Sequence, residues 1–455
     1  MSSISARIER LPFGRFHRRL LLMGGLGYTF DGLDAAVIAF VLPVVMKLWS
    51  LSSVQTGVLG SANFIGYLIG ALTAGLLGDR IGRRPVMMYA LVLYTVASFV
   101  SAFASSWTVF FWTRVVAGLG TGAESAIVAP FLAEFIARRL RGGFTGALAG
   151  FFSFGFVGAA LLGYFIVPTG PQAWRIVLAL TALPVLMLLW WRRALPESPR
   201  WLEAQGRGAA AAAVLDRMEA EADGPLPPLA AETAAPPMAG AGRRGFRVQL
   251  AALFSPALRR VTAMTWLMWL SITFSYYAFF TWIPTLLVQS GMTITRSFGY
   301  SIAIYLAQIP GYYSAAWLNE RIGRQAVIAG YMVLGGAAAT ALSAAHAPMQ
   351  IMVAGIFLSF FMNGTYAGVY AYTPEVFPTD VRATGTGLAS AIGRIGSIAS
   401  PIIVGYIFPR AGFAGVFGMT TVVLLIGAAA VLLLGVKTLR RSLEDIAREE
   451  LTTPG

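Results

Sequence analysis

Twelve long apolar stretches constrain this chain more than any other feature of its sequence. Each is about 20 residues long or longer, which is what an α-helix needs to cross the hydrocarbon core of a bilayer. Hydrophobic residues fill 57% of the 455 positions, and charged residues fill only 12%. Soluble domains carry about 25% charged residues, so this composition excludes a soluble enzyme and a disordered chain. The sequence predicts an all-α polytopic membrane protein with twelve transmembrane helices.

The predicted spans form two groups of six, separated by one long polar interval. The first group covers residues 20–46, 56–78, 85–104, 107–137, 143–167 and 173–192, and the second covers 261–289, 297–318, 325–345, 349–372, 383–408 and 412–436. The interval is rich in Ala, Pro, Arg and Glu, which predicts a linker with an amphipathic helix near Ala209–Glu221. We therefore predict an N-terminal bundle (1–192), a cytoplasmic linker (193–260), a C-terminal bundle (261–436) and a cytoplasmic tail (437–455).

Lys and Arg residues gather in alternate loops between the predicted spans. If the N-terminus is cytoplasmic, 28 of the 34 basic residues fall in cytoplasmic segments, two (Arg114 and Arg394) fall within spans, and only Lys47, Arg175, Arg296 and Arg410 fall outside. This is the positive-inside pattern, so the net charge of +14 reports topology and predicts no nucleic-acid partner. We predict a multi-pass protein of the cell inner (plasma) membrane with both termini in the cytoplasm.

Side chains that serve enzymes and metal sites are scarce. The chain has no cysteine, and its two histidines, His17 and His346, lie far apart in the sequence. Disulfides, thiolate metal sites and cysteine nucleophiles are excluded, and a zinc site is not expected. Nucleophile–base pairs and phosphate-binding loops are not evident either, so we predict no enzyme activity, no cofactor and no metal.

A short motif repeats at the same place in each half. Gly78–Arg84 (Gly-Asp-Arg-Ile-Gly-Arg-Arg) follows the second span, and Asn319–Gln325 (Asn-Glu-Arg-Ile-Gly-Arg-Gln) follows the eighth. Matched motifs in two six-helix halves are typical of transporters built from two pseudo-symmetric bundles. These residues resemble the major facilitator superfamily, and the resemblance covers nearly the whole chain.

Further motifs extend this resemblance to metabolite:proton symporters. Arg114–Gly120 resembles the fourth-helix motif, and Pro196–Leu202 and Pro374–Thr379 resemble the segments that close each half in sugar porters and their relatives. Asp31–Asp34 and Gly393–Ser397 are similar to elements of bacterial niacin (nicotinate) and aromatic-acid transporters and of organic-ion carriers. The chain lacks the glutamine pair of sugar porters on its seventh span, which argues against a hexose. The resemblance implies the major facilitator fold and secondary transport by alternating access, and we expect a monomer in the lipid bilayer.

Three ionisable residues in the first half form the predicted proton-coupling site: Asp31, Asp34 and Arg114. By helical rise, Asp34 lies roughly 21 Å from the cytoplasmic edge and Arg114 roughly 10 Å from the outer edge. Both then lie at one depth in a core of about 30 Å, where pairing lowers the cost of burying each charge. The resemblance implies that protonation of the acid frees the arginine; a static ion pair is the alternative. Asp31 is predicted to share the proton, unless it serves helix capping or packing.

Glu124 is the remaining acidic residue well inside a predicted span. It lies roughly 25 Å from the outer edge, which is near the cytoplasmic side. A second proton site is one interpretation. We favour the other, in which Glu124 pairs with the arginines of the inner face.

Arg394 is the centre of the predicted substrate site. It lies roughly 16 Å into the eleventh span, near the midplane, between Gly393 and Gly396. A guanidinium fork at a central cavity suits a carboxylate, whereas snorkelling or pairing with Asp34 is the alternative. Aromatic and amide residues at middle depths are predicted to bind a flat ring, although ordinary helix packing explains any single one equally well. They are Tyr276, Tyr277, Tyr305, Gln308, Asn363 and Tyr366.

Charged residues at the cytoplasmic helix ends are predicted to form a gate. Alternating acids and bases can make salt bridges that break on rocking, whereas topology alone needs only the bases. The predicted set is Asp79, Arg83, Arg84, Glu134, Arg138, Glu197 and Arg200 in the first half, with Glu320, Arg324, Glu375 and Arg382 in the second.

Three functional hypotheses follow. The leading one is proton-coupled uptake of a small organic monocarboxylate, with nicotinate as the specific prediction. The second keeps the mechanism and changes the cargo to a benzoate-type acid, an organic cation or a sugar. The third is a receptor-like membrane protein without flux, which would be expected to lose its midplane charges or to carry signalling domains.

Overall fold

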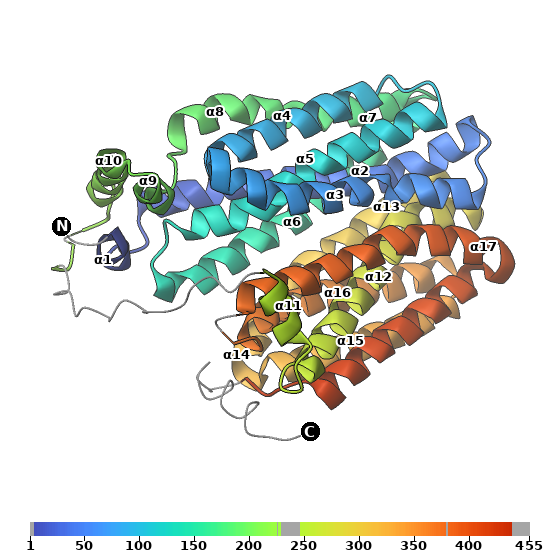
Figure 1. The fold of residues 1–455 in the computed structure, drawn as a ribbon. Coiled ribbons are helices and arrows are strands. Elements are labelled where there is room, and N and C mark those ends of the chain that lie inside the picture. Colours follow the sequence, from blue (N-terminus) through green and yellow to red (C-terminus); the bar gives the residue numbers. More distant parts are fainter. Residues whose placement is uncertain (1–3, 225, 229–245, 379–380, 439–455) are drawn as a thin grey trace. The chain divides into compact units, whose positions relative to one another are not determined.

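The computed structural model describes residues 4–224, 226–228, 246–378 and 381–438, without the side chains of Leu76, Asp79, Leu188 and Phe246. All regular structure in these ranges is helical (Figure 1). Ten of the helices there are long and apolar enough to cross a membrane. The predicted all-α class is therefore confirmed.

The first half of the chain contains eight α-helices and two short 3-10 helices. They are α1 (Ile4–Glu9), α2 (Arg15–Leu48), α3 (Ser53–Ile81), α4 (Arg83–Ser101), α5 (Trp107–Ala133), α6 (Arg138–Ile166), η1 (Val167–Thr169), α7 (Ala173–Leu180), η2 (Leu183–Leu186) and α8 (Met187–Ala194). The predicted sixth span corresponds to α7, η2 and α8 together. Pro184 lies in η2, and a proline inside a helix removes a backbone hydrogen bond, which explains the interruption.

The rest of the chain begins with short helices of the linker and continues with long ones. These are α9 (Pro199–Ala204), α10 (Gly208–Ala220), α11 (Phe246–Leu253), α12 (Arg259–Gln289), α13 (Ile294–Leu306), α14 (Gln308–Ile322), α15 (Arg324–Ser343), α16 (Pro348–Glu375) and α17 (Arg382–Leu434). The amphipathic helix predicted near Ala209–Glu221 is α10. The 53 residues of α17 are two helices joined at Gly412, whose φ of 62° is outside the helical range.

The predicted eighth span is two helices, α13 and α14, that meet at Ala307. Pro310 explains this break, because its ring nitrogen has no hydrogen to donate to the carbonyl of Leu306. With α17 divided at Gly412, every one of the twelve predicted spans lies on helix.

Contacts between residues divide the chain into two compact units. Unit 1 comprises Met1–Ala35, Ala62–Phe156 and Arg175–Ala241, and unit 2 comprises Ala36–Ser61, Val157–Trp174 and Gly242–Gly455. The later part of α2, the start of α3 and the end of α6 thus pack within unit 2. The division into bundles at 1–192 and 261–436 therefore remains a prediction.

Small residues allow two helices of unit 1 to approach closely. An added side-chain carbon at Gly66 or Gly70 of α3 would collide with the backbone of α5, and one at Gly118 or Gly122 of α5 would collide with α3. Helices in membranes associate through such stripes because the missing side chains bring backbones into van der Waals contact. This contact fixes α5 beside α3 and brings Arg114 close to Asn63.

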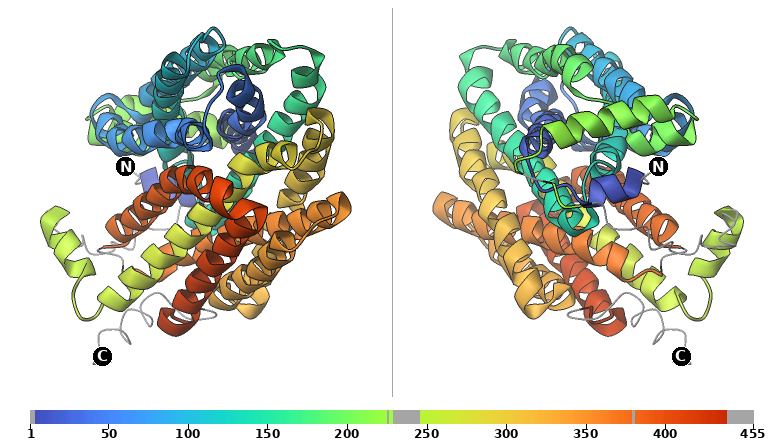
Figure 2. Two further views of the ribbon diagram at one scale, coloured as in Figure 1. Left: turned by 90° about the vertical axis from the view of Figure 1, so that its right-hand side faces the viewer. Right: turned by 90° about the vertical axis from the view of Figure 1, so that its left-hand side faces the viewer.

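Unit 2 is built around α12, α15, α16 and α17. The contacts between α12 and α17 are extensive, and α15 contacts both α16 and α17. These helices lie side by side in Figures 1 and 2. Most of α12 is buried, as expected for the central helix of a bundle.

The repeated motif has the same backbone conformation in both halves. Gly82 joins α3 to α4 with φ 100° and ψ 155°, and Gly323 joins α14 to α15 with φ 91° and ψ 150°. Positive φ favours glycine, which has no Cβ to collide with the backbone. The equivalence inferred from sequence is therefore confirmed at these two turns.

Candidate functional site

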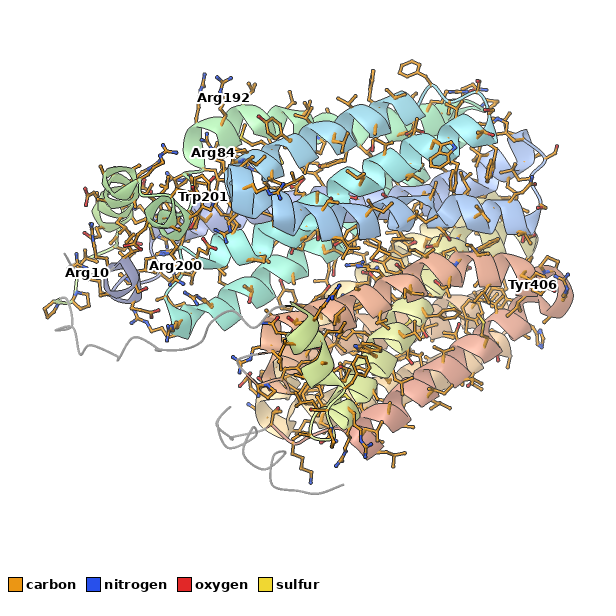
Figure 3. All side chains as sticks on the ribbon, in the orientation of Figure 1. Arg10, Arg84, Arg192, Arg200, Trp201 and Tyr406 are labelled. Carbon is orange, nitrogen blue, oxygen red and sulfur yellow. The ribbon has the colours of Figure 1, made fainter. Side chains whose placement is uncertain are left out.

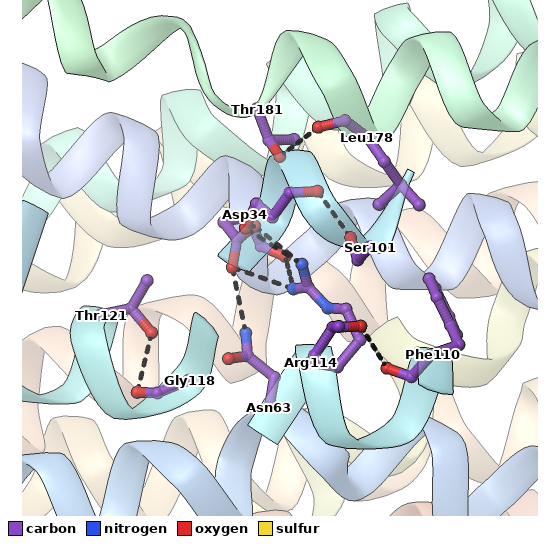
Figure 4. Close-up of polar contacts among 11 residues, drawn as sticks. Asp34, Asn63, Ser101, Phe110, Arg114, Gly118, Thr121, Leu178 and Thr181 are labelled. Carbon is purple, nitrogen blue, oxygen red and sulfur yellow. Dashed lines mark hydrogen bonds and ion pairs between the residues drawn. The ribbon is translucent and has the colours of Figure 1, made fainter. Parts of the chain in front are cut away.

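Asp34 of α2 and Arg114 of α5 form a bidentate ion pair inside unit 1. Arg114 Nη2 lies 2.9 Å from Asp34 Oδ2, and Nη1 lies 3.0 Å from Oδ1. Nη2 also donates to the backbone oxygen of Asp34 at 2.9 Å, and both side chains are 0% exposed. The pairing predicted from their depths is confirmed (Figure 4).

Two neutral side chains complete this network. Ser98 of α4 donates its hydroxyl to Asp34 Oδ1 at 2.7 Å, and Asn63 of α3 donates its amide to Oδ2 at 3.5 Å. Sequence reasoning missed both residues, because single polar residues are common in transmembrane helices. Groups from α3, α4 and α5 thus contact one buried carboxylate of α2, and any change in its charge alters contacts among all four helices.

Asp31 and Glu124 are also buried in unit 1, with 2% and 0% exposure. Their four carboxyl oxygens make no hydrogen bond to any described group. Asp31 interacts electrostatically with Glu124 and Asp34. The favoured interpretation of Glu124 as a partner of the inner arginines is wrong for the described part of the chain. Its carboxylate lies against α2 at Gly27.

The predicted substrate residues of unit 2 lie mostly in one aromatic and amide cluster. Tyr276 of α12 donates its hydroxyl to Gln308 Oε1 at 2.9 Å, and Asn363 of α16 donates its amide to the backbone oxygen of Gln308 at 2.7 Å. The rings of Tyr276 and Tyr366 meet edge to face, with centroids 5.1 Å apart. The rings of Tyr277 and Tyr276 also meet edge to face, with centroids 5.1 Å apart. The structure therefore brings α12, α14 and α16 together at these residues.

The side-chain nitrogen of Gln308 has no hydrogen-bond partner among the described residues of this cluster. Its side chain is 0% exposed, and its Nε2 makes no hydrogen bond within the described ranges. A buried amide donor without a partner is unfavourable, so a bound acceptor at this point would gain a hydrogen bond at little additional desolvation.

Tyr305 differs from the other predicted substrate residues. Its hydroxyl donates to the backbone oxygen of Phe280 at 2.6 Å, and its ring packs on Phe280 and Phe40. The sequence spacing predicted that Tyr305 and Gln308 share one helix face. Ala307, where α13 meets α14, keeps a helical backbone with φ −64° and ψ −17°, and both side chains reach α12, Gln308 at Tyr276 and Tyr305 at Phe280, in agreement with that expectation.

Arg394 lies on α17 and is partly buried. Its neighbour Gly393 faces α12, where an added carbon would lie 3.0 Å from Thr273 Oγ1 and 3.1 Å from the ring of Trp269. Thr273 in turn accepts the hydroxyl of Tyr366 at 3.3 Å, and Arg394 interacts electrostatically with Tyr366. The cation is therefore beside the aromatic cluster.

Charged groups at one end of unit 1 form the first half of the predicted gate. Arg83 Nε lies 3.2 Å from Glu134 Oε1, and Ser198 donates its hydroxyl to the other oxygen of Glu134. Glu197 Oε2 accepts the backbone amide of Arg84 at 3.2 Å. Burial raises the pKa of the Glu197 carboxyl above its ordinary value, against the opposing effect of hydrogen bonds from the backbone of Ser198 and Arg84.

The remaining members of that set have different surroundings. Arg138 contacts Glu9 at 3.7 Å, although the sequence had grouped it with Glu134 and Glu197. Arg200 Nε makes no hydrogen bond within the described part. The side chain of Asp79 lies outside the described residues. Figure 3 shows Arg84, Arg200 and Trp201 at the same end of unit 1.

In unit 2 the gate residues centre on Arg324. Its Nη2 lies 2.9 Å from Glu320 Oε1, and its Nε lies 3.1 Å from Glu375 Oε1. Arg382 donates its Nε to the backbone oxygen of Phe377 at 3.2 Å. Both predicted acids therefore contact the same guanidinium.

A salt-bridge network between the N-terminus and the linker was not predicted. Arg7 of α1 lies 2.6 Å from Asp216 and 2.8 Å from Glu219 of α10, and Arg10 lies 2.7 Å from Glu219. The hydrogen bond from Arg7 lowers the pKa of Glu219 and raises that of Arg7. The sequence signal was the row of acids on α10, but the basic N-terminus had been assigned to topology alone.

Comparisons with known proteins identify the class. Residues 19–449 match the model of the sugar (and other) transporter family. The solved xylose transporter XylE from E. coli, in an inward open conformation, has the same fold, with a TM-score of 0.74 and 18% identity over 95% of this chain and 99% of that one. This chain belongs to the sugar (and other) transporter family of the major facilitator superfamily. It is a multi-pass secondary transporter of small molecules and not an enzyme.

Two relatives refine this picture. The niacin transporter NiaP of Acinetobacter baylyi is 39% identical over 442 residues, which cover 97% of this chain and 99% of the relative. A gallate transporter of Pseudomonas putida is 30% identical, over 88% of this chain and 87% of the relative. Both names refer to small aromatic carboxylic acids.

No group of three or more His, Cys, Asp or Glu in the described ranges can hold a metal ion.

Proposed function

We propose that this chain imports a small aromatic monocarboxylate, nicotinate in particular, together with protons. The observation that carries the proposal is the 39% identity to a niacin transporter over 97% of the chain. We propose that it acts as a monomer in the inner membrane, and that both of its termini lie in the cytoplasm, in agreement with the distribution of basic residues.

The cluster in unit 2 has the chemistry that nicotinate requires. Arg394 supplies a guanidinium for the carboxylate, because planar bidentate recognition of a carboxylate is what this group does best. Tyr276 and Tyr366 offer aromatic faces and edges to the pyridine ring. The unused Nε2 of Gln308 is a donor for the pyridine nitrogen, which is an acceptor at neutral pH.

The pair in unit 1 has the chemistry that proton coupling requires. A carboxylate held by a guanidinium is ionised, and a proton that reaches Asp34 removes the attraction for Arg114. Ser98 and Asn63 then also change partners. One protonation therefore loosens the contacts between four helices, which is the kind of change that shifts a transporter between two conformations.

The charged helix ends fit a gate that opens in every cycle. The contacts of Arg83 with Glu134 and of Arg324 with Glu320 and Glu375 are partly exposed. Exposed pairs contribute about 0–1 kcal/mol each, so a few of them hold a closed state without trapping it.

A benzoate-type acid is the second candidate, and the gallate transporter among the relatives favours it. Benzoate shares the ring and the carboxylate of nicotinate but has no ring nitrogen. The two candidates therefore differ in their use of Gln308 and agree in their use of Arg394.

The test is uptake of labelled nicotinate into proteoliposomes under an inward proton gradient, with unlabelled competitors. The proposal expects competition by nicotinate, weaker competition by benzoate, and none by nicotinamide, xylose or an organic cation. Thermal stabilisation of the purified protein provides a second readout, because a ligand at 100 times its Kd adds about 2.7 kcal/mol. Stabilisation by xylose or by the cation, and not by nicotinate, would overturn the cargo assignment.

A further inference from the structure

Two buried carboxyl groups in unit 1 have no part in the Asp34–Arg114 network. Asp31 lies on α2 and Glu124 on α5, with 2% and 0% exposure. None of their four oxygens makes a hydrogen bond within the described residues. Burying one such group without a partner is strongly unfavourable when it is ionised, and burying two together is worse.

The geometry of α2 and α5 makes these two groups face one another. Glu124 Oε1 lies 2.9 Å from the position that a side-chain carbon at Gly27 would occupy. Gly27 is four residues before Asp31, and residues four apart lie on the same face of a helix. Glu124 therefore approaches α2 one turn from Asp31, and the two carboxyl groups interact electrostatically.

A third polar group lies near this pair. Tyr94 of α4 is 0% exposed, and its hydroxyl makes no hydrogen bond to any described group. Gly120, one turn before Glu124, brings α5 against α4, since an added carbon there would lie 2.6 Å from the backbone nitrogen of Tyr94. The hydroxyl interacts electrostatically with Glu124, Asp31 and Asp34. It can donate to one carboxyl oxygen and accept from a protonated one.

A fourth helix, α8, also packs against this cluster. Trp191 of α8 is 0% exposed, and its Nε1 is likewise without a partner in the described part. Its ring lies 3.3 Å from the position of an added carbon at Gly27, where Glu124 also lies. The hydroxyl of Tyr94 and the ring of Trp191 thus accompany carboxyl groups from α2 and α5, so four helices contribute to the cluster.

Protons are the ligand that this cluster fits. Arg114 is the nearby cation, and both of its terminal nitrogens are bound to Asp34. No set of three His, Cys, Asp or Glu side chains in the described ranges can hold a metal ion. Among the titratable and charged groups facing the pair are Asp34 on α2, Arg114 on α5 and Tyr94 on α4. A shared proton lets one carboxyl donate to the other and removes one of two adjacent charges.

We propose that Asp31, Glu124 and Tyr94 form a second proton-binding site, separate from the Asp34–Arg114 pair, which takes up and releases a proton in each transport cycle. On uptake, an O–H bond forms at one carboxyl oxygen and the second carboxylate accepts its hydrogen bond. On release that O–H bond breaks, and the proton leaves to water. The role in the cycle rests on the proposed function; the proton-binding site itself does not.

The second site changes the charge that moves in each cycle. One ionised monocarboxylate with one proton is electrically neutral, whereas the same anion with two protons carries one net positive charge. Wild-type uptake is therefore driven by a membrane potential, negative inside, as well as by a pH gradient. Glu124→Gln removes one titrating group, so this variant keeps uptake driven by the pH gradient and loses the response to the potential.

The first experiment needs no substrate. Infrared difference spectra of the purified full-length protein, recorded during a pH titration, report the carbonyl stretch of protonated carboxyl groups. We expect a band that Glu124→Gln and Asp31→Asn each abolish, and that Tyr94→Phe shifts because the hydroxyl donor is lost. Glu203→Gln on the exposed surface of α9 is the matched control and leaves the band unchanged. A band that persists unaltered in all three variants would overturn the proposal.

The second experiment measures charge movement. Labelled nicotinate uptake into proteoliposomes is driven by a potassium diffusion potential at equal pH on both sides. We expect accumulation in the wild type and in Glu203→Gln, and none in Glu124→Gln. Equal accumulation in wild type and Glu124→Gln would contradict the transport role of the second site. An intact infrared band without nicotinate flux would instead refute the proposed cargo.

Discussion

The centres of the two units hold polar groups among apolar helices in different ways. In unit 1 the central carboxylate of Asp34 is saturated, with ligands from three other helices and a guanidinium that is 0% exposed. In unit 2 the central groups are tyrosines and amides, Gln308 Nε2 makes no hydrogen bond to a described residue, and Arg394 remains partly exposed. A saturated charge pair responds to a proton, whereas a set of aromatic faces with spare donors can respond to a ligand. We infer that unit 1 couples transport to protons and that unit 2 recognises the transported substrate.

The largest expected effect comes from breaking the charge pair. Asp34→Asn leaves Arg114 buried without its counter-charge, which costs about 3–5 kcal/mol of stability. It also removes the protonation that loosens the contacts between the four helices, a change that the second proton site cannot supply, so uphill nicotinate accumulation is lost while counterflow exchange persists. Uptake assays with and without a proton gradient measure both properties.

The matched control for that variant replaces both partners. Asp34→Asn with Arg114→Gln removes the buried charge altogether, so most of the lost stability returns in a thermal melt. Coupling does not return, because no titrating group remains in the pair. Unchanged uphill uptake in Asp34→Asn would show that this pair is only structural.

The second largest expected effect concerns the proposed carboxylate site in unit 2. Arg394→Ala removes the proposed carboxylate partner, and we expect nicotinate affinity to fall about 10- to 100-fold, equivalent to ~1.5–3 kcal/mol. Binding of nicotinamide, already weak, changes little. Arg410→Ala, on the exposed part of α17, serves as the control and has no effect. Equal losses for the acid and the amide would refute an anion site at Arg394.

A smaller effect separates the two candidate cargoes. Gln308→Met removes the donor proposed for the pyridine nitrogen, so nicotinate affinity falls about five-fold, or ~1 kcal/mol, relative to benzoate. The double variant with Tyr276→Phe also removes the hydroxyl that Gln308 accepts, and should show the same selectivity with better stability. Identical responses of nicotinate and benzoate would place the ring nitrogen elsewhere.

The smallest effect concerns the linker and lies outside both centres. Arg7 lowers the pKa of Glu219 below its ordinary value of 4.5, so the ion pair stabilises α1 against α10 above that pH. This contribution disappears as the pH falls through the lowered pKa, when the carboxylate becomes protonated. The protection of α10 against hydrogen exchange, relative to the intrinsic rate at each pH, should fall below pH 4.5 in the wild type. In Glu219→Gln it should be fast already at neutral pH, and a protected α10 there would contradict the prediction.

Sequence reasoning performed well where a single physical rule dominates. The stretches predicted from hydropathy correspond to helices in the structure, because a bilayer demands about 20 apolar residues for each helix that crosses it. Depth along the helices was sufficient to pair Asp34 with Arg114, since few ionised side chains share the interior. The motif repeated at Gly78–Arg84 and Asn319–Gln325 predicted equivalent places in the two halves, and the positive φ values of Gly82 and Gly323 explain why glycine recurs there.

Sequence reasoning failed where the answer depended on which helix faces meet. Glu124 was assigned by depth alone to the inner arginines, but the missing side chain at Gly27 opens a place for its carboxylate on α2. The eighth span was assumed to be one continuous helix, whereas it is interrupted at Ala307 ahead of Pro310. The acids of α10 were visible in the sequence, but their pairing with α1 connects residues more than 200 positions apart.

The central claim is that nicotinate and protons move together through this protein. Proteoliposomes with a pH-sensitive dye inside are given an inward nicotinate gradient at equal starting pH and clamped potential. The account predicts that the interior acidifies with the wild type faster than with protein-free vesicles, and that Asp34→Asn abolishes the difference while labelled nicotinate still exchanges. Nicotinate entry through the wild type without acidification beyond the protein-free rate would contradict it.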